Sequence, residues 1–122
     1  MTDMPTIMIL DDQLLVAFQA ARLLEKNGFQ ILGPFGDIDA ALAGLEATPP
    51  RAAVLDINLG NGMTSEALAD ALVERNLPFV FYTGYGSANT LPERFSHVAV
   101  LSKPVRPEEL ISAVNAMTAT SE

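Results

Sequence analysis

Five short apolar runs recur along the chain, and the longer segments between them carry apolar residues at helical spacing. The runs are Thr6–Leu10, Phe29–Leu32, Ala52–Leu55, Phe79–Tyr82 and Val98–Leu101. Nearly continuous hydrophobic runs, rather than alternating ones, are typical of strands that are buried on both faces of a parallel sheet. The pattern therefore predicts five parallel strands joined by helices.

The first helical segment begins shortly after the first run. Leu14, Phe18 and Ala21 fall on one face at helical spacing, and we predict that this face packs on the sheet. Asn27-Gly28 provides a C-terminal stop signal, because both residues tolerate the left-handed backbone conformation that ends many helices. A helix that ends near these two residues is expected.

Capping residues place the beginnings of three further helices. Asp37 or Asp39 is expected to cap the second helix, and Thr64 or Ser65 the third, because short polar side chains accept hydrogen bonds from the first free N–H groups. Pro107 is a favourable first residue for the last helix, since its missing N–H would have no partner there.

The segment between the last two runs has a weaker helical pattern. Gly84, Gly86 and Pro92 interrupt it, so only a short helix is expected, around Ala88–Leu91 or Glu93–Phe95. The alternation is then (βα)5, which right-handed crossovers fold into a doubly wound five-stranded parallel sheet of flavodoxin-like order 2-1-3-4-5. We expect one domain, residues 1–122, with its core at about residues 6–117.

Polar residues follow four of the five apolar runs. Asp11 and Asp12 follow the first, Asp56 the third, Thr83 the fourth and Lys103 the fifth. In open parallel sheets, ligands bind outside the carboxyl ends of the strands. These residues therefore form one candidate site.

The carboxylates of this candidate site favour a metal ion. Asp11, Asp12 and Asp56 would repel one another in one crevice, unless a hard divalent cation lies among them. Mg²⁺ prefers oxygen ligands, keeps part of its water shell and also binds phosphate oxygens. The backbone carbonyl of Asn58, two residues after Asp56, could supply a further ligand.

Asp56 is placed to act as a nucleophile, because a carboxylate can attack a phosphoryl group and hold it as an aspartyl-phosphate. Phosphoryl transfer needs mainly positioning and neutralisation of the phosphoryl oxygens. The Lys103 ammonium and the Thr83 hydroxyl could supply both.

Composition narrows the function further. The 122 residues carry a formal net charge of -8 and no cysteine, which excludes disulfides, a cysteine nucleophile and cysteine-ligated metals. The acidic balance argues against direct binding of nucleic acid. No apolar run approaches the ~18 residues of a membrane span, and no secretion signal is evident at the N-terminus. We expect a cytoplasmic protein with no membrane partner.

The sequence resembles the receiver domain of two-component response regulators from about Thr6 to Met117. The motifs that carry the resemblance are Ile9-Leu10-Asp11-Asp12, Val54-Leu55-Asp56-Ile57-Asn58-Leu59, Thr83-Gly84 and Lys103-Pro104. The resemblance implies that Asp56 is the phosphoacceptor, Asp11 and Asp12 the acidic metal-site pair, Thr83 the switch hydroxyl and Lys103 the phosphate-contacting lysine. It also implies a cis peptide bond before Pro104.

A narrower resemblance is to the "FAT GUY" single-domain receivers. It rests on the run Pro78-Phe79-Val80-Phe81-Tyr82-Thr83-Gly84-Tyr85-Gly86 and on the loop Asn58-Leu59-Gly60-Asn61-Gly62. Tyr82 stands where that signature has alanine. The resemblance implies alphaproteobacterial signalling downstream of a sensor histidine kinase, which would be of the HWE type, or of a phosphotransfer protein.

One position departs from the common receiver pattern. Val100 stands three residues before Lys103, where most receivers have a tyrosine or phenylalanine that moves together with the threonine. A valine cannot make the same motion. Tyr85, or the Gly84–Arg94 segment around it, is therefore an alternative candidate for reporting phosphorylation.

The predicted function is that of a stand-alone receiver without an effector domain. It would act as a phosphorelay shuttle, a phosphate sink or a partner-binding switch, and it would not be a conventional turnover enzyme. A monomer is expected, with a dimer as the alternative. The main alternative function is a haloacid-dehalogenase-like Mg²⁺-dependent phosphatase, although that class needs its two catalytic aspartates two residues apart, whereas Asp11 and Asp12 are adjacent.

Overall fold

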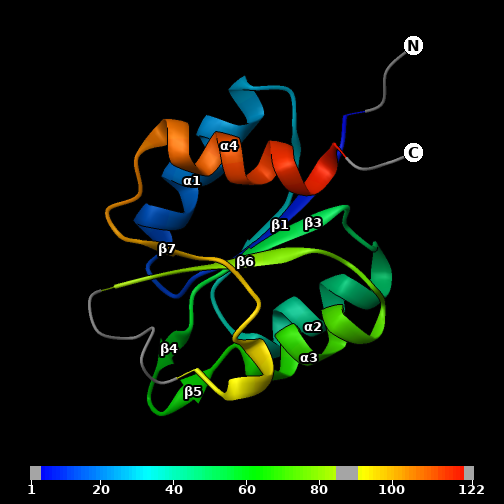
Figure 1. Ribbon diagram of the computed structural model, residues 1–122, viewed down its shortest axis with the longest axis vertical. Coiled ribbons are helices and arrows are strands. Elements are labelled where there is room, and N and C mark those ends of the chain that lie inside the picture. The colour runs from blue at the N-terminus through cyan, green and yellow to red at the C-terminus, as the bar shows by residue number, and fades with distance from the viewer. Residues whose placement is uncertain (1–3, 85–90, 120–122) are drawn as a thin grey trace.

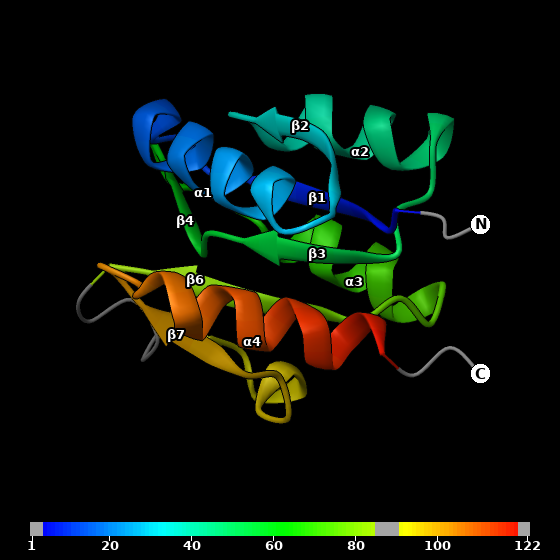
Figure 2. The same cartoon turned by 90° about the horizontal axis from the view of Figure 1, so that it is seen from above.

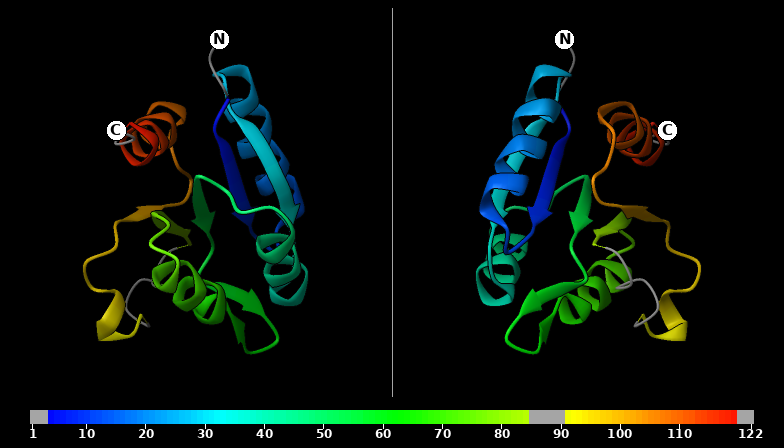
Figure 3. Two further views of the ribbon diagram at one scale, coloured as in Figure 1. Left: turned by 90° about the vertical axis from the view of Figure 1, so that its right-hand side faces the viewer. Right: turned by 90° about the vertical axis from the view of Figure 1, so that its left-hand side faces the viewer.

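The chain forms an α/β domain in three layers, seen in the computed structural model, which describes residues 4–84 and 91–119. A five-stranded sheet of order β2-β1-β3-β6-β7 lies between α1 and α4 on one face and α2 and α3 on the other (Figures 1 and 3). The sheet strands are β1 (Thr6–Leu10), β2 (Gln30–Phe35), β3 (Ala52–Leu55), β6 (Phe79–Thr83) and β7 (Val100–Ser102). The α-helices are α1 (Leu14–Lys26), α2 (Ile38–Ala47), α3 (Glu66–Glu74) and α4 (Pro107–Thr118).

Every pairing within this sheet is parallel. Counted among the sheet strands alone, the order is 2-1-3-4-5, so the predicted doubly wound flavodoxin-like fold is confirmed. All strands run the same way, and their carboxyl ends meet at the edge that lies to the left in Figure 2. That edge is where the candidate residues were predicted to converge.

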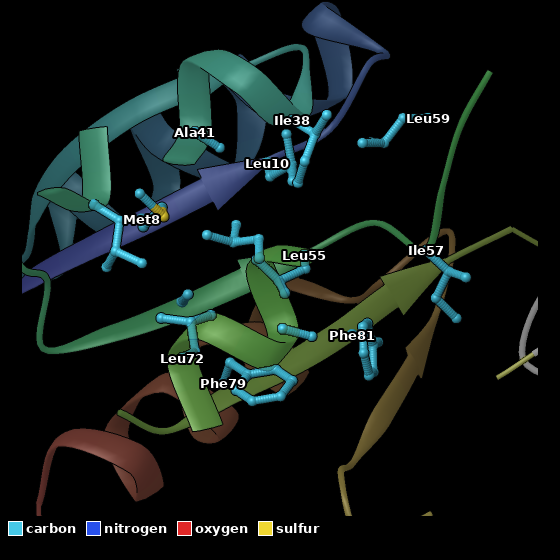
Figure 4. Packing of buried hydrophobic residues seen from close by; sticks show 14 of the residues in the cluster. Met8, Leu10, Ile38, Ala41, Leu55, Ile57, Leu59, Leu72, Phe79 and Phe81 are labelled. Atoms are coloured by element: carbon cyan, nitrogen blue, oxygen red, sulfur yellow. The ribbon is translucent and has the colours of Figure 1, made fainter. Parts of the chain in front are cut away.

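The core consists of two clusters, one on each face of the sheet. Alternate residues of β1 divide between them: Met8 and Leu10 face α2 and α3, whereas Ile7 and Ile9 face α1 and α4. Figure 4 shows the first cluster, in which buried side chains from β1, β3 and β6 meet residues of α2 and α3. Burial on both faces explains why the strands appear in the sequence as continuous apolar runs.

The predicted inner face of the first helix is wrong. Leu14 is 51% exposed and Phe18 is 53% exposed, and only Ala21 of the predicted stripe is buried. The residues of α1 that pack on the sheet are Ala17, Ala20, Ala21 and Leu24. Small alanine side chains let the helix approach the sheet closely, which turns the larger apolar side chains outward. Hydrophobicity alone therefore identified the helix but not its buried face.

The predicted second strand is also displaced. It was expected at Phe29–Leu32, but β2 begins at Gln30 and continues to Phe35, with a register shift against β1 between Met8 and Leu10. A Cβ atom on Gly33 would lie 2.8 Å from the backbone nitrogen of Phe35, and the residue has φ of +102°. Only glycine can adopt this backbone conformation in the space available. The pattern of hydrophobic residues does not indicate such an irregularity.

Of the remaining strands, two have the predicted bounds and two are slightly shifted. The strands at Thr6–Leu10 and Ala52–Leu55 are confirmed with the predicted ends. Thr83 belongs to β6 itself, and the last strand occupies Val100–Ser102 rather than Val98–Leu101. Of the two alternative positions for the short helix, Glu93–Phe95 is confirmed and forms the 3-10 helix η2. Most of Ala88–Leu91 lies outside the described residues.

Two helix caps resolve the alternatives that the sequence left open. The Asp37 side chain accepts a hydrogen bond from the Ala40 N–H at 2.8 Å, so Asp37 caps α2. Ser65 occupies the cap position of α3 but makes no capping hydrogen bond with its side chain, and the Glu66 N–H instead donates to Thr64 Oγ1 at 3.4 Å. No described helix is both long enough and apolar enough to cross a membrane.

A short hairpin after β3 was not predicted. Its strands, β4 (Asn58–Gly60) and β5 (Met63–Thr64), pair antiparallel. Asn61 and Gly62 form its turn, and both have positive φ, as an Asn-Gly turn requires. The hairpin begins at Asn58, separated from Asp56 only by Ile57, at the carboxyl edge of the sheet.

Candidate functional site

The carboxyl ends of four strands bring the predicted site residues together. Leu10 of β1 pairs with Leu55 of β3, so Asp11 and Asp56, the next residues along each strand, lie side by side. Thr83 pairs with Ser102, which places Lys103 at the same edge. Asp11 and Asp56 are buried, whereas Asp12 is exposed.

The three aspartates form one cluster. A carboxylate oxygen from each of Asp11, Asp12 and Asp56 lies within 4.8 Å of the other two. This set of hard oxygen donors fits a divalent cation such as Mg²⁺, and one exposed member leaves an approach from solvent. When bound, such an ion would neutralise negative charge on both the protein and a phosphoryl group.

Lys103 lies between the two buried carboxylates. Its Nζ donates to Asp11 Oδ2 at 2.9 Å, to Asp56 Oδ2 at 3.1 Å and to Gln13 Oε1 at 3.1 Å. The side chain is 13% exposed, so these contacts are screened less than a surface ion pair. The ammonium therefore offsets part of the repulsion between Asp11 and Asp56.

Asp56 has hydrogen-bond donors on both carboxylate oxygens. Thr83 Oγ1 donates to Oδ1 at 3.1 Å, and Lys103 donates to Oδ2. The two donors therefore contact different oxygens of the same carboxylate, one on each side. The proposed ligand role of the Asn58 carbonyl remains a prediction, and Tyr85 lies outside the described residues.

The environment of Asp56 disfavours its charged form. Burial raises the pKa of this carboxyl above its ordinary value; Lys103 lowers the pKa, and the negative charge of Asp11 raises it further, with a net upward shift. Opposite behaviour is found on the surface, where the hydrogen bond from Arg94 lowers the pKa of Asp70. The ionised form of Asp56 therefore destabilises the metal-free fold.

We expect the substitution Asp56→Asn to raise the unfolding midpoint of the metal-free protein at pH 7 by a few degrees, because it removes the unfavourable buried charge. The pKa of Asp56 is higher in the folded state than in the unfolded state, so the folded wild type takes up its proton at a higher pH than the unfolded chain does. The advantage of the variant should therefore decrease as the pH falls and vanish below both pKa values. Thermal unfolding between pH 7 and pH 3, in the presence of a chelator, measures this difference.

The matched control is Asp70→Asn, which removes a carboxylate whose pKa is shifted in the opposite direction. This control should not stabilise the protein. An Asp56→Asn variant that is no more stable than wild type at pH 7 would contradict the unfavourable charge at Asp56.

The site also contains Tyr82 and Gln13, which the sequence pattern did not indicate as site residues. Tyr82 donates its hydroxyl to Asp11 Oδ2 at 2.8 Å, and the backbone N–H of Gln13 donates to Asp11 Oδ1 at 2.9 Å. Burial and the charge of Asp11 raise the pKa of Tyr82, so the phenol keeps its proton. A hydroxyl in an apolar strand needs a buried partner, and that was the available signal.

The structure confirms the cis peptide bond expected before Pro104 and places Val100, which stands where most receivers have an aromatic residue. The Lys103-Pro104 bond is cis, and so is Gly33-Pro34. Val100 is partly buried and packs against the core cluster of Phe81 and Phe95.

The chain thus combines a doubly wound parallel sheet with three clustered carboxylates and a lysine at the carboxyl edge of that sheet. The model of the response regulator receiver domain matches residues 7–115. The chain belongs to the response regulator receiver domain family. Receivers are typically phosphoacceptors rather than enzymes.

Solved structures agree with this assignment. SdrG from Sphingomonas melonis Fr1 is 33% identical to this chain, with a TM-score of 0.83, and the match covers 96% of this chain and 98% of SdrG. The receiver domain of NtrX from Brucella abortus is 28% identical, with a TM-score of 0.82 over 94% of this chain and 99% of that one. Both resemble this chain over nearly their full length.

Two curated relatives are longer proteins. The transcriptional regulatory protein PdtaR of Mycobacterium tuberculosis is 27% identical over 111 residues, which is 88% of this chain and 54% of PdtaR. The phyllosphere-induced regulator PhyR of Methylorubrum extorquens is 27% identical over 116 residues, which is 93% of this chain and 43% of PhyR. This chain therefore spans about half the length of the curated relatives it matches.

Proposed function

We propose that this receiver accepts a phosphoryl group on Asp56, in the presence of Mg²⁺ held by Asp11, Asp12, Asp56 and the backbone carbonyl of Asn58. The observation that carries the proposal is the convergence of three carboxylates with Lys103 and Thr83 on one edge of the sheet. A nucleophile, a cation site and two donors for phosphoryl oxygens are the parts that phosphoryl transfer requires.

The donor would be a phosphohistidine of a sensor histidine kinase or of a phosphotransfer protein. An oxygen of Asp56 forms a bond to phosphorus while the phosphorus–nitrogen bond breaks, and the electron pair stays on the imidazole nitrogen. Lys103 and Thr83, which already contact opposite oxygens of Asp56, would neutralise and orient the phosphoryl oxygens. Attack of water on the aspartyl-phosphate later releases inorganic phosphate.

The role in signalling that we propose follows from the resemblance to single-domain receivers. A stand-alone receiver of the FAT GUY type, placed downstream of an HWE-type kinase, is supported by the motif around Thr83 and by the match to SdrG over nearly its full length. Similarity to PhyR points to the same signalling setting. The output would run through a partner, as a phosphorelay shuttle, a phosphate sink or a switch.

The donor protein needs a surface to cover while its histidine reaches Asp56. The outer face of α1 offers one, because Leu14, Leu15 and Phe18 are 51%, 73% and 53% exposed. This apolar face begins one residue after Gln13, which contacts Lys103 of the site. Covering it would desolvate the entrance as well as bury apolar area.

Incubation with a small phosphodonor and Mg²⁺, followed by intact-mass measurement, tests the function. We expect one added phosphoryl group on wild type and none on Asp56→Asn. Continuous release of phosphate from varied substrates without an adduct would instead indicate a haloacid-dehalogenase-like phosphatase. Absence of both adduct and phosphate release would contradict the proposal.

A second arm of the experiment uses a phosphorylated histidine kinase as the donor. Phe18→Ser should slow transfer from the kinase at least about fivefold, as expected for a contact worth more than 1 kcal/mol, while transfer from the small donor stays unchanged. Equal rates of transfer from the kinase for wild type and Phe18→Ser would show that the outer face of α1 is not the docking surface. The phosphoacceptor function would not be contradicted by that result.

A further inference from the structure

We propose that Tyr82 is a positioning residue whose hydroxyl holds the Asp11 carboxylate in place for the divalent cation, a role that rests on the phosphoacceptor function proposed above. The hydroxyl lies 2.8 Å from Asp11 Oδ2. Tyr82 is 2% exposed and Asp11 is fully buried. The phenol therefore contacts a candidate cation ligand through a buried hydrogen bond.

Asp11 accepts three hydrogen bonds from its surroundings. The Gln13 backbone N–H occupies Oδ1, and Lys103 Nζ shares Oδ2 with the Tyr82 hydroxyl. Buried carboxylates need such donors, because an unpaired buried charge is strongly unfavourable. Two of the three donors come from groups with a fixed position: the backbone at Gln13 and the buried ring of Tyr82.

Lys103 cannot serve as a permanent partner of Asp11. It also donates to Asp56 Oδ2 and to Gln13 Oε1, and it ends a flexible four-carbon stem. A phosphoryl group on Asp56 would place new anionic oxygens beside the ammonium and draw it away from Asp11. The Tyr82 hydroxyl would then be the remaining side-chain donor on Asp11 among the contacts that the described residues make.

The Tyr82 ring is held firmly enough for this role. It belongs to the core cluster on the α1 and α4 face, where it packs with Val54, Leu110 and Val114. A tyrosine has only two side-chain torsions, so a buried ring loses little further freedom when its hydroxyl is oriented. Donors behind a metal ligand fix the ligand's orientation and raise metal affinity, typically by 10–100-fold.

The ring itself makes a second contact in the site. Lys103 Nζ lies 4.8 Å from the centroid of the Tyr82 ring, within the range of a cation–π interaction. The hydroxyl thus acts on Asp11, and the ring face acts on Lys103. An alanine, which the narrower receiver signature has at this position, offers neither contact, so the arrangement is specific to a chain that carries tyrosine here.

The test separates hydroxyl from ring. Tyr82→Phe removes only the hydroxyl, and we expect the dissociation constant for Mg²⁺, measured by titration calorimetry, to rise about tenfold or more. Thr118→Val is the matched control, because it also deletes a hydroxyl, but one that bonds to the backbone carbonyl of Val114 in α4. The control should bind Mg²⁺ as wild type does.

A spectroscopic measurement follows the Tyr82 hydroxyl in the wild-type protein itself. The chain contains two tyrosines, so ¹³C-labelled tyrosine gives a simple spectrum, in which Tyr82→Phe assigns the Tyr82 signal. We expect the hydroxyl-bearing carbon of Tyr82 to shift when Mg²⁺ is added and to lose that response in Asp11→Asn. Tyr82→Leu, which removes the ring as well, should in addition slow phosphoryl transfer, because Lys103 loses its aromatic support.

The outcomes distinguish this inference from the function on which it rests. Tyr82 does not position Asp11 if the dissociation constant of Tyr82→Phe for Mg²⁺ is within about twofold of the wild-type value, or if the Tyr82 signal does not shift when Mg²⁺ is added. Asp56 could still accept a phosphoryl group in either case. If wild type itself neither binds Mg²⁺ nor gains a phosphoryl group, both proposals are wrong.

Discussion

Lys103→Met is expected to slow phosphorylation of Asp56 by a small phosphodonor about a hundredfold or more. Lys103 supplies the ammonium that lies 3.1 Å from Asp56 Oδ2, and methionine keeps a long side chain but removes the charge. Loss of one preorganised donor to developing negative charge typically costs a factor of 10² to 10³ in rate. The measurement is the rate of adduct formation by intact mass at saturating Mg²⁺.

The matched control for this loss is Lys26→Met. Lys26 is the other lysine of the chain and is exposed in the last turn of α1. The same change of charge there should leave the rate unchanged, which excludes an effect of net charge. A Lys103→Met variant that forms the adduct within tenfold of the wild-type rate would show that the ammonium is dispensable for transfer.

Phe81→Ala is expected to lower the free energy of unfolding by about 3–5 kcal/mol. Phe81 is fully buried, and its ring meets the rings of Phe79 and Phe95 edge-on, with centroids 5.5 Å and 5.8 Å apart. Truncation would leave a cavity between the sheet and η2 and remove both aromatic contacts. Denaturant unfolding at pH 7 measures the loss.

Phe18→Ala provides the comparison, because it makes the same chemical change on the exposed face of α1. Its side chain is 53% exposed, so its free energy of unfolding should remain close to that of wild type. Equal losses for the two variants would mean that α1 packs more tightly than its exposure indicates. A loss below about 1 kcal/mol for Phe81→Ala would contradict its place in the core.

Much of the fold could be predicted because its signal is local. Continuous apolar runs, capping residues and breakers occur within short windows of the chain, and burial of the strands on both faces makes the runs long enough to recognise. The charged and polar groups at the carboxyl ends of β1, β3, β6 and β7 could be predicted as one site because parallel strands place those ends at one edge of the sheet.

The failures share a different origin. Leu14 and Phe18 were predicted to face inward, yet the alanines of α1 pack on the sheet, because which face is buried depends on how closely a helix can approach. The β2 boundary depends on the irregular backbone at Gly33. These features follow from packing between distant segments, which hydrophobic periodicity does not describe.

The sequence by itself determined the class of this protein: the order of strands and helices, the acidic cluster and the residue types needed to accept a phosphoryl group. Only the tertiary structure decided how those groups are held. Tyr82 reaches Asp11 across 71 positions of sequence, and Lys103 reaches it across 92. Such hydrogen bonds between residues far apart in the sequence form only because the fold brings their side chains close together. No local pattern of residues contains that information.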